Sequence, residues 1–373
     1  PTWANRDRFI LSAGHGSMFL YSLLHLTGYP LPLEELQRFR QWGSKTPGHP
    51  EYRDTPGVEV TTGPLGQGFA NAVGFAMAEA HLAATYNRPN HTIVDHFTYV
   101  IASDGDLMEG VAAEAASLAG HLRLSKLICV YLDNRITLAG NTALTFSDDT
   151  HVRFIGYGWH VQHVNGNDLP GIEEAIRMAQ ADPRPSLIIA RTHIGFGSPH
   201  KQDTHEAHGS PLGPEEAKAT KANLGWPLEP MFAIPDDVRP VFEQVKIQGQ
   251  THEREWNQRF DAYAKEHPEL AQRWKQAMSG ELPPGWDRDV PTFTEADGSI
   301  ASRQASGKVL NALAKSIPWL VGGSADLNPS TNTYLKDLGD FLPGSYAGRN
   351  MHFGVREHAM GAAVNGMALH GGL

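Results

Sequence analysis

Two short turns in the middle of the chain carry the oxygen donors that a hard divalent cation binds. Ser103-Asp104-Gly105 directly follows one apolar run, and Asp133-Asn134 directly follows the next. Asp104 offers a carboxylate oxygen, Asn134 an amide oxygen and Ile136 a backbone carbonyl, a set suited to Mg²⁺ or Ca²⁺. Mg²⁺ commonly completes such a set with water and phosphate oxygens. The turns therefore predict a metal site that binds a diphosphate, with Gly105 letting backbone N–H groups approach it.

The elements around these turns predict that both lie at one edge of a parallel sheet. Strands are expected at 97–102 and 127–132, with a helix near 109–120 between them. Ligands of parallel sheets bind at the carboxyl ends of the strands, where both turns fall. Taken singly, Asp104 could cap a helix and Asn134 could form a turn. Their separation by 30 residues, with a helix and a strand between, favours a shared site.

The remaining patterns predict two α/β domains joined by a linker. In the first domain, residues 1–280, a helix is expected from Ser17 as N-cap to Gly28 as stop, and a glycine- and alanine-rich helix at 68–86. A helix at 169–181 and a strand at 186–190 follow, and residues 251–279 are expected to form surface helices. The proline-containing stretch 281–298 is the expected linker. The second domain, 299–373, is expected to contain a helix at 301–315, a strand at 318–322 and a helix from 356, and to be incomplete.

Composition and charge exclude several classes of protein. The chain has 373 residues, 40% of them hydrophobic and 19% charged, which is typical of a folded globular protein. Its net charge of −10, with scattered basic residues, argues against a nucleic-acid partner. No apolar run reaches the ~18 residues of a membrane span. The single cysteine, Cys129, cannot form an intramolecular disulfide, which favours a cytoplasmic protein. The terminal residues, Pro1 and Leu373, suggest cuts in a longer polypeptide.

Three other functional motifs are too incomplete to support a function. Residues 66–71 give G-x-G-x-x-N, a dinucleotide fingerprint without its third glycine. His205 and His208 are spaced by three residues, whereas a zincin helix needs four, and the surrounding glycine and proline disfavour that helix. The chain also contains neither a P-loop motif nor a G-x-S-x-G elbow.

The metal turns resemble the thiamine diphosphate fingerprint, and an ordered set of motifs over essentially the whole chain resembles the transketolase family. These motifs are Leu11-Ser-Ala-Gly-His-Gly-Ser17, Ser44-Lys-Thr-Pro-Gly-His-Pro50, Thr62-Gly-Pro-Leu-Gly-Gln-Gly68, Ile194-Gly-Phe-Gly-Ser198, Gly322-Gly-Ser-Ala-Asp-Leu327 and Gly354-Val-Arg-Glu-His358. One departure is Ser103, where the family usually has glycine. We expect the serine to be tolerated if its φ is negative.

The resemblance implies a role for each matching residue. The metal, Mg²⁺ or Ca²⁺, would be held by Asp104, Asn134 and the Ile136 carbonyl. Thiamine diphosphate would be bound by His15, Gly63, Leu65, Gly105, Glu109, Asn134, His208 and Glu357. The sugar phosphate substrate would contact His49, His208, Arg303, Asp326 and Ser330. The catalytic set would be Glu357, His15, His208 and His49. Without the resemblance, Glu357 could equally be a first-turn glutamate favoured by the helix dipole, and the histidines could be ordinary loop residues.

The same resemblance implies the activity and the assembly. The thiamine diphosphate-binding fold would have parallel sheets flanked by helices, and the reaction would be reversible transfer of a two-carbon ketol unit from a ketose phosphate to an aldose phosphate, in the pentose phosphate pathway or the Calvin cycle. Glu357 would hydrogen-bond the pyrimidine ring of a cofactor held mainly by the partner subunit of a homodimer. The alternatives are a truncated or non-catalytic thiamine-fold chain, dihydroxyacetone synthase and 1-deoxyxylulose-5-phosphate synthase.

Overall fold

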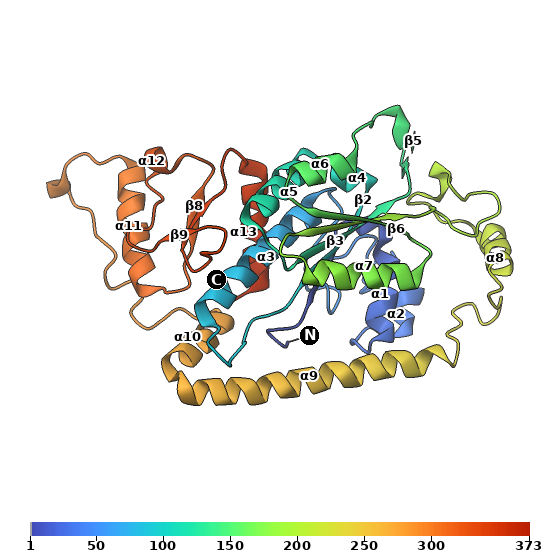
Figure 1. Cartoon of the computed structure of the whole chain (residues 1–373), viewed down its shortest axis with the longest axis horizontal. Coiled ribbons are helices and arrows are strands. Elements are labelled where there is room, and N and C mark those ends of the chain that lie inside the picture. The colour runs from blue at the N-terminus through green and yellow to red at the C-terminus, as the bar shows by residue number, and fades with distance from the viewer. Residues whose placement is uncertain (1) are drawn as a thin grey trace.

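A computed structural model describes residues 2–373, which form two α/β units (Figure 1). The first unit contains a five-stranded sheet in the order β1-β2-β3-β7-β6, and every neighbouring pair is parallel. The strands are β1 (Arg8–Leu11), β2 (Thr98–Ser103), β3 (Leu127–Asp133), β6 (His160–Asn165) and β7 (Ser186–Arg191). The expected fold class is confirmed, although β1 and β6 had no counterpart among the predicted strands.

Helices cover both faces of this sheet. On one face, α3 (Gln67–Tyr86) and α5 (Gly110–Leu122) pack against residues such as Val100 and Cys129 in the main core. On the other face, α7 (Leu169–Ala181) packs Ala175 and Ala179 against Ile128 and Ile188. Strand residues are thus buried on both sides, which explains why β2, β3 and β7 have continuous apolar runs.

The second unit contains a small parallel sheet in the order β8-β10-β9. Its elements are α11 (Ser302–Ser316), β8 (Gly322–Ser324), α12 (Asn328–Thr331), β9 (Asp340–Phe341), β10 (Asn350–His352) and α13 (Glu357–His370). The strand expected at 318–322 begins only at Gly322, as β8, because Trp319 packs against Ala277 instead of entering the sheet.

The two units are joined by direct contact between α3 and α13. A Cβ atom built on Gly74 would lie 2.0 Å from the Ala363 carbonyl oxygen, and one built on Gly366 would lie 2.0 Å from that of Asn71. The two backbones therefore approach as closely as glycine allows. Both helices begin at the same end of this contact, since Gln67 Nε2 lies 2.9 Å from His358 Nε2.

The first turn of α13 is completed by a residue of the first unit. Glu114 of α5 accepts a hydrogen bond at Oε2 from the Ala359 backbone N–H, at 2.9 Å. Ala359 N–H is one of the groups that lack a partner within a helix, so Glu114 caps α13 from outside.

The segment between the two sheets contains a long helix that buries three aromatic side chains in its second half. α9 (Val238–Glu266) runs along the lower side of the molecule in Figure 1 and is followed by α10 (Pro268–Ser279). Trp256, Phe260 and Tyr263 are buried against Leu82 and Tyr86 of the α3 end. The surface helices expected at 251–279 are therefore present, but this aromatic stripe belongs to a core. No helix within residues 2–373 is both long and apolar enough to cross a membrane.

The other elements are short. The prediction that Ser17 caps α1 is wrong. Gly16 is the N-cap, and Ser17 is the first residue of the helix, with its hydroxyl donating to the Gly48 carbonyl at 2.9 Å. Gly28 does follow the helix end, with a φ of +84°. These elements are α1 (Ser17–Leu26), α2 (Leu33–Gln37), α4 (Asp104–Met108), β4 (Ile136–Thr137), β5 (Gly140–Asn141), α6 (Thr150–Gly156) and α8 (Pro214–Asn223).

Candidate functional site

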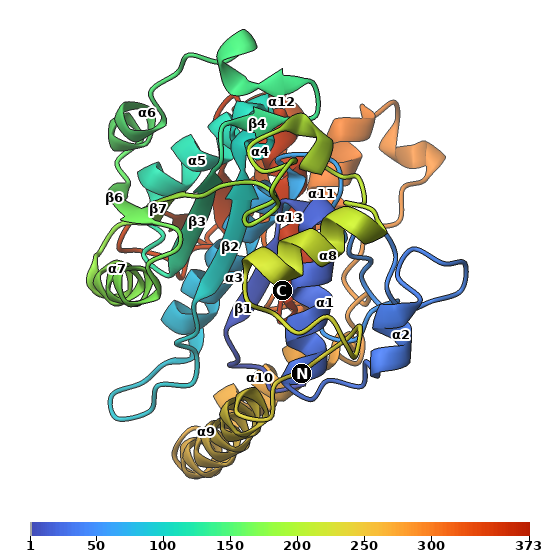
Figure 2. The same cartoon turned by 90° about the vertical axis from the view of Figure 1, so that its right-hand side faces the viewer.

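Three adjacent strands end at one place, and each is followed by a residue of the predicted site. β1 leads to the 3₁₀ turn Gly14–Gly16 with His15, β2 leads to Asp104 at the start of α4, and β3 leads to Asn134. Figure 2 shows α4 and β4 together beyond the end of β2. The parallel register thus brings together turns that are far apart in sequence.

Asp104 and Asn134 are in contact, as their positions in the sequence predicted. Asp104 Oδ2 accepts from the Asn134 backbone N–H at 3.3 Å, and Oδ1 accepts from the Tyr131 hydroxyl at 2.9 Å. Asn134 Oδ1 in turn accepts from the Ile136 N–H at 2.8 Å. Burial, together with the nearby Asp133 carboxylate, raises the pKa of Asp104. The ionised form of this buried group would be stabilised by a cation.

The turn that contains Gly63 and Leu65 lies against the ends of the first two strands. A Cβ atom on Gly105 would lie 2.9 Å from a Leu65 methyl group, and one on Gly14 would lie 2.8 Å from the Gly63 nitrogen. Gly63 has a φ of +142° and packs against the ring of His49. The absence of side chains at these glycines is therefore what lets the three segments meet.

His15 and His208 form a stacked pair beside this turn. Their ring centroids are 4.7 Å apart and their planes are 28° from parallel. Burial lowers the pKa of both histidines, and each of His208 and His49 lowers that of His15 further. Both rings of the stacked pair are therefore neutral near pH 7, and each has one nitrogen that donates and one that accepts.

The sequence did not single out Asp106, although it is the most connected side chain of the site. It is fully buried and accepts from the Ser12 hydroxyl, the Gly66 N–H and both donors of Ser103. Ser103 has a φ of −116°, which meets the condition under which a serine is tolerated here. The only local signal for Asp106 was its place two residues after Asp104.

The remaining site residues lie on or near the second unit, or are exposed. Glu357 is an exposed residue at the first position of α13, beside the start of α3 in the same chain. Arg303 is on α11, which packs against α12 with Ser330, and Asp326 precedes α12 with a φ of +64°. In Figure 1, α11 and α12 lie at the opposite end of the molecule from β5, the strand that pairs with β4, so these residues are not gathered around Asp104. Glu109, also exposed, follows α4.

The site fits a cation and an anionic cofactor. Thr62 Oγ1 and His208 Nδ1 are buried and find no hydrogen-bond partner among residues 2–373. Both groups are near the Gly63 turn or the His15 ring and could be satisfied by a ligand. Among residues 2–373, no cationic side chain forms a hydrogen bond with the Asp104 carboxylate, whose partners are the Tyr131 hydroxyl and the Asn134 N–H. Oxygen donors of this kind suit Mg²⁺ and Ca²⁺.

Comparison with known proteins relates the chain to transketolases. The models of the transketolase thiamine diphosphate binding domain and the transketolase pyrimidine binding domain match residues 1–283 and 298–373. The transketolase of Halalkalibacterium halodurans is 60% identical over 374 residues, covering 100% of this chain and 56% of that protein. The Bacillus subtilis transketolase is 54% identical over 376 residues, with the same two coverages.

Solved transketolase structures also have the same fold as this chain. Transketolase from Leishmania mexicana has a TM-score of 0.97 at 47% identity. A Pichia stipitis transketolase in complex with sedoheptulose-7-phosphate has a TM-score of 0.97 at 46% identity. Each match covers 100% of this chain and 56% of the other, so the chain spans a little over half the length of its relatives.

The doubly covered parallel sheet, the oxygen donors at its carboxyl edge and the matched domains define an α/β protein of the thiamine diphosphate-binding class. Within that class, the chain belongs to the transketolase family. The resemblance inferred from the ordered motifs is thereby confirmed.

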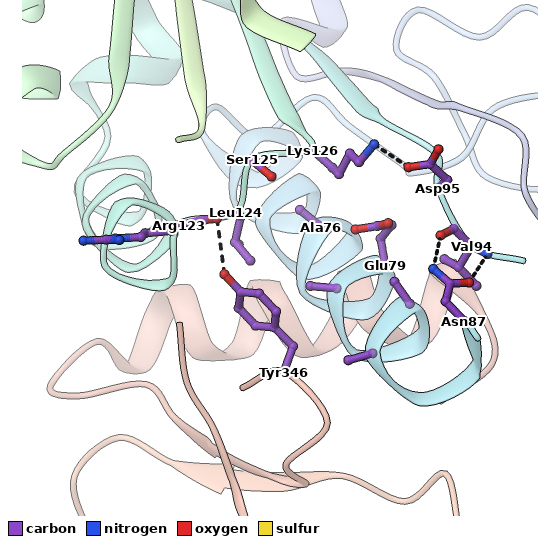
Figure 3. A pocket seen from close by; sticks show the side chains of 13 residues that line it. Ala76, Glu79, Asn87, Val94, Asp95, Arg123, Leu124, Ser125, Lys126 and Tyr346 are labelled. Atoms are coloured by element: carbon purple, nitrogen blue, oxygen red, sulfur yellow. Dashed lines mark hydrogen bonds and ion pairs between the residues drawn. The ribbon is translucent and has the colours of Figure 1, made fainter. Parts of the chain in front are cut away.

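A separate cavity of about 300 Å³ lies at the other edge of the first sheet (Figure 3). It is lined by residues that precede β2 and β3, including Asp95 and Lys126, by α3, and by Tyr346 of the second unit. Glu79 projects from α3 on the side of Lys126 and Asp95. The cavity lies where β2 and β3 begin, whereas Asp104 follows the carboxyl end of β2, where parallel sheets bind ligands. The two sites are therefore distinct.

We expect Glu79 to make the stability of the protein depend on pH. Burial raises its pKa from 4.5 to about 8; the charge of Lys126 lowers it and that of Asp95 raises it, both to a smaller extent. Between these pH values the folded chain retains a proton that the unfolded chain releases, so stability falls as pH rises. In the wild type this fall in the free energy of unfolding should amount to roughly 3 to 5 kcal/mol between pH 5 and pH 8. Glu79→Gln should abolish it, because glutamine does not titrate.

The measurement is the apparent Tm of both proteins across this pH range. The variant should melt above the wild type at pH 8, and the difference should shrink towards pH 5. Glu281→Gln, at an exposed position in the segment after α10, is the control and should leave the pH profile unchanged. Parallel profiles for Glu79→Gln and the wild type would contradict a raised pKa at Glu79.

Proposed function

We propose that the protein catalyses the transketolase reaction, the reversible transfer of a two-carbon ketol unit from a ketose phosphate to an aldose phosphate. The observation that carries the proposal is the contact between the Asp104 and Asn134 turns beside the Gly63–Leu65 turn, in a chain of this family. Membership in the pentose phosphate pathway or the Calvin cycle, and a cytoplasmic location, are parts of the same proposal.

The first unit would hold the cofactor. Asp104, Asn134 and the Ile136 carbonyl would bind Mg²⁺ or Ca²⁺, and the metal would be shared with the diphosphate, against which Gly105 would lie. Gly63 and Leu65 would contact the rings. When bound, thiamine diphosphate supplies a carbon nucleophile that the protein's own side chains lack. The glycines would permit close approach of the cofactor, and the exposed Leu65 side chain would lie against its rings.

The histidines would handle the substrate's hydroxyl and carbonyl oxygens. His15 and His208 form a neutral stacked pair, so each can donate one hydrogen bond to an oxygen and accept another from a hydroxyl. His49 is exposed next to Gly63, where it could bind substrate hydroxyls. Neutral imidazoles of this kind can also move protons near physiological pH.

Arg303 and Ser330, with Asp326 between them in the proposed site, would bind the phosphate end of the substrate. A guanidinium offers two parallel, charge-assisted hydrogen bonds to phosphate oxygens, and a serine hydroxyl can add another. These residues lie on the second unit, away from the metal turns of their own chain. A homodimer would bring the second unit of one subunit to the first unit of the other, and Glu109 and Glu357 would then lie around the cofactor.

The metal part of this proposal predicts that thiamine diphosphate binds only with a divalent cation. Asp104→Ala removes the single carboxylate of the set and should abolish binding, because the diphosphate would then face the site without its bridging ion. Calorimetry on the full-length protein, with Mg²⁺ and with EDTA, measures the affinity. Equal affinity under the two conditions would reject the metal assignment.

Arg303 is expected to determine affinity for the phosphate group. Arg303→Ala should raise KM for a sugar phosphate donor by about 10- to 100-fold while changing KM for unphosphorylated hydroxypyruvate much less. Arg303→Lys is the matched control: it keeps the charge, loses the two-pronged geometry and should fall between. Losses of equal size with both donors would assign Arg303 a structural role.

The position of Glu357 distinguishes a site shared between subunits from one within a chain. Its exposure suits contact with a partner, but the start of α13 also lies beside α3 of its own chain. We expect activity to return when inactive Glu357→Ala and Asp104→Ala subunits are mixed, up to about a quarter of the wild-type value for random exchange in a two-site dimer. No recovery despite proven subunit exchange would place both residues in the site of one chain.

A further inference from the structure

Asp106 is a buried carboxylate that accepts four hydrogen bonds from three segments. Oδ1 accepts from the Ser12 hydroxyl at 2.7 Å and from the Gly66 N–H at 2.8 Å. Oδ2 accepts from the Ser103 N–H at 2.8 Å and from its hydroxyl at 2.9 Å. Four donors and no acceptor facing it are the partners that an ionised carboxylate requires, and a buried one needs all of them.

The donors on Oδ1 include the groups that α3 cannot satisfy by itself. Gly66, the N-cap of α3, has no side chain and a φ of +75°, and α3 has no side-chain cap. Its Phe69 N–H donates to Ser12 Oγ at 2.9 Å, and the Ser12 hydroxyl in turn donates a hydrogen bond to Asp106 Oδ1. Asp106 thus places a negative charge at the amino end of a 20-residue helix, where the helix dipole favours it.

The donors on Oδ2 belong to the turn that begins at the end of β2. Asp106 is therefore bound on one oxygen to the segment that follows Gly63 and Leu65, and on the other to the residue before Asp104. No other side chain within residues 2–373 forms hydrogen bonds to both of these segments. Direct hydrogen bonds therefore fix the distance of the Asp106 carboxylate from Gly66 and from Ser103.

We propose that Asp106 is a positioning residue that holds the Gly63–Leu65 turn in register with the Asp104–Gly105 turn, so that the cofactor surface is formed before any ligand binds. The inference deepens the proposed function and rests on it for the identity of the ligand. Pre-formed geometry spares binding the entropy of ordering these turns. Asp106 acts through its neighbours and need not touch the cofactor.

Two variants of the full-length protein test this. Asp106→Asn keeps the shape but replaces one acceptor oxygen with an NH₂ group that faces two donors. Ser12→Ala removes the Ser12 bond to Asp106 Oδ1 together with the bond from the Phe69 N–H, but leaves the bonds of Asp106 to Gly66 and Ser103 in place. It serves as the second variant if Asp106→Asn does not fold. Amide hydrogen exchange of the cofactor-free protein should become faster at Gly66 and Phe69 in Asp106→Asn, and at Phe69 in Ser12→Ala. The thiamine diphosphate Kd, measured by calorimetry with Mg²⁺, should rise about 10- to 100-fold in Asp106→Asn.

Ile188→Ala is the control for lost stability alone, since Ile188 is fully buried on the face of the sheet covered by α7. It should lower Tm without a change in Kd or in local exchange at Gly66 and Phe69. Unchanged exchange and a Kd within about twofold of wild type in both test variants would overturn the proposal. If the wild type itself fails to bind thiamine diphosphate, the proposed function fails, while the exchange rates still decide the role of Asp106.

Discussion

The contact between α3 and α13 determines how the two units of this protein are arranged. At Gly74 and Gly366 each helix meets the backbone of the other, so there is no layer of side chains that could shift to accommodate a different arrangement. Protein interiors respond to added volume by strain, and a backbone cannot move aside as a side chain can. The start of α13, and Glu357 with it, is consequently held at a set place relative to the Gly63–Leu65 turn that precedes α3.

The first unit places its polar groups at one end of an otherwise apolar structure. Asp104 is nearly fully buried, Asp106 is fully buried, and two further polar atoms, on Thr62 and His208, lack partners among the described residues. Desolvating charged and polar groups is costly, so this end of the sheet is less stable than a uniformly apolar one. Sites of this kind commonly sacrifice stability for binding, and a cation with an anionic ligand would offset the cost.

The sequence predicted those features that depend on local pattern and strand topology. Apolar runs identified β2, β3 and β7, and the parallel arrangement then placed Asp104 beside Asn134. Two kinds of feature escaped it. The hydrogen bond from Ser12 to Asp106 joins residues 94 positions apart, so no local sequence pattern could predict it. The apolar run around Trp319 was predicted to be a strand because periodicity cannot distinguish a run buried in a sheet from one packed against a helix.

The positions of the proposed metal residues could be anticipated more fully than those of the proposed substrate residues. Asp104 and Asn134 directly follow strands, whose positions follow from the sheet. Arg303, Asp326 and Ser330 lie on a different unit, and their relation to the first depends on contacts between helices and between subunits. Family resemblance supplied their roles, and the geometry of one chain does not bring them to Asp104.

The cap that Glu114 provides to α13 has a consequence for how the chain orders itself. The first turn of a helix is the part most prone to fraying, and here its N–H at Ala359 is satisfied by a side chain 245 residues earlier in the sequence. Undocking the units would remove that cap and leave α13 to unravel from its amino end. Glu357 is in that first turn, so docking of the two units stabilises the helical backbone of the residue proposed to serve the cofactor.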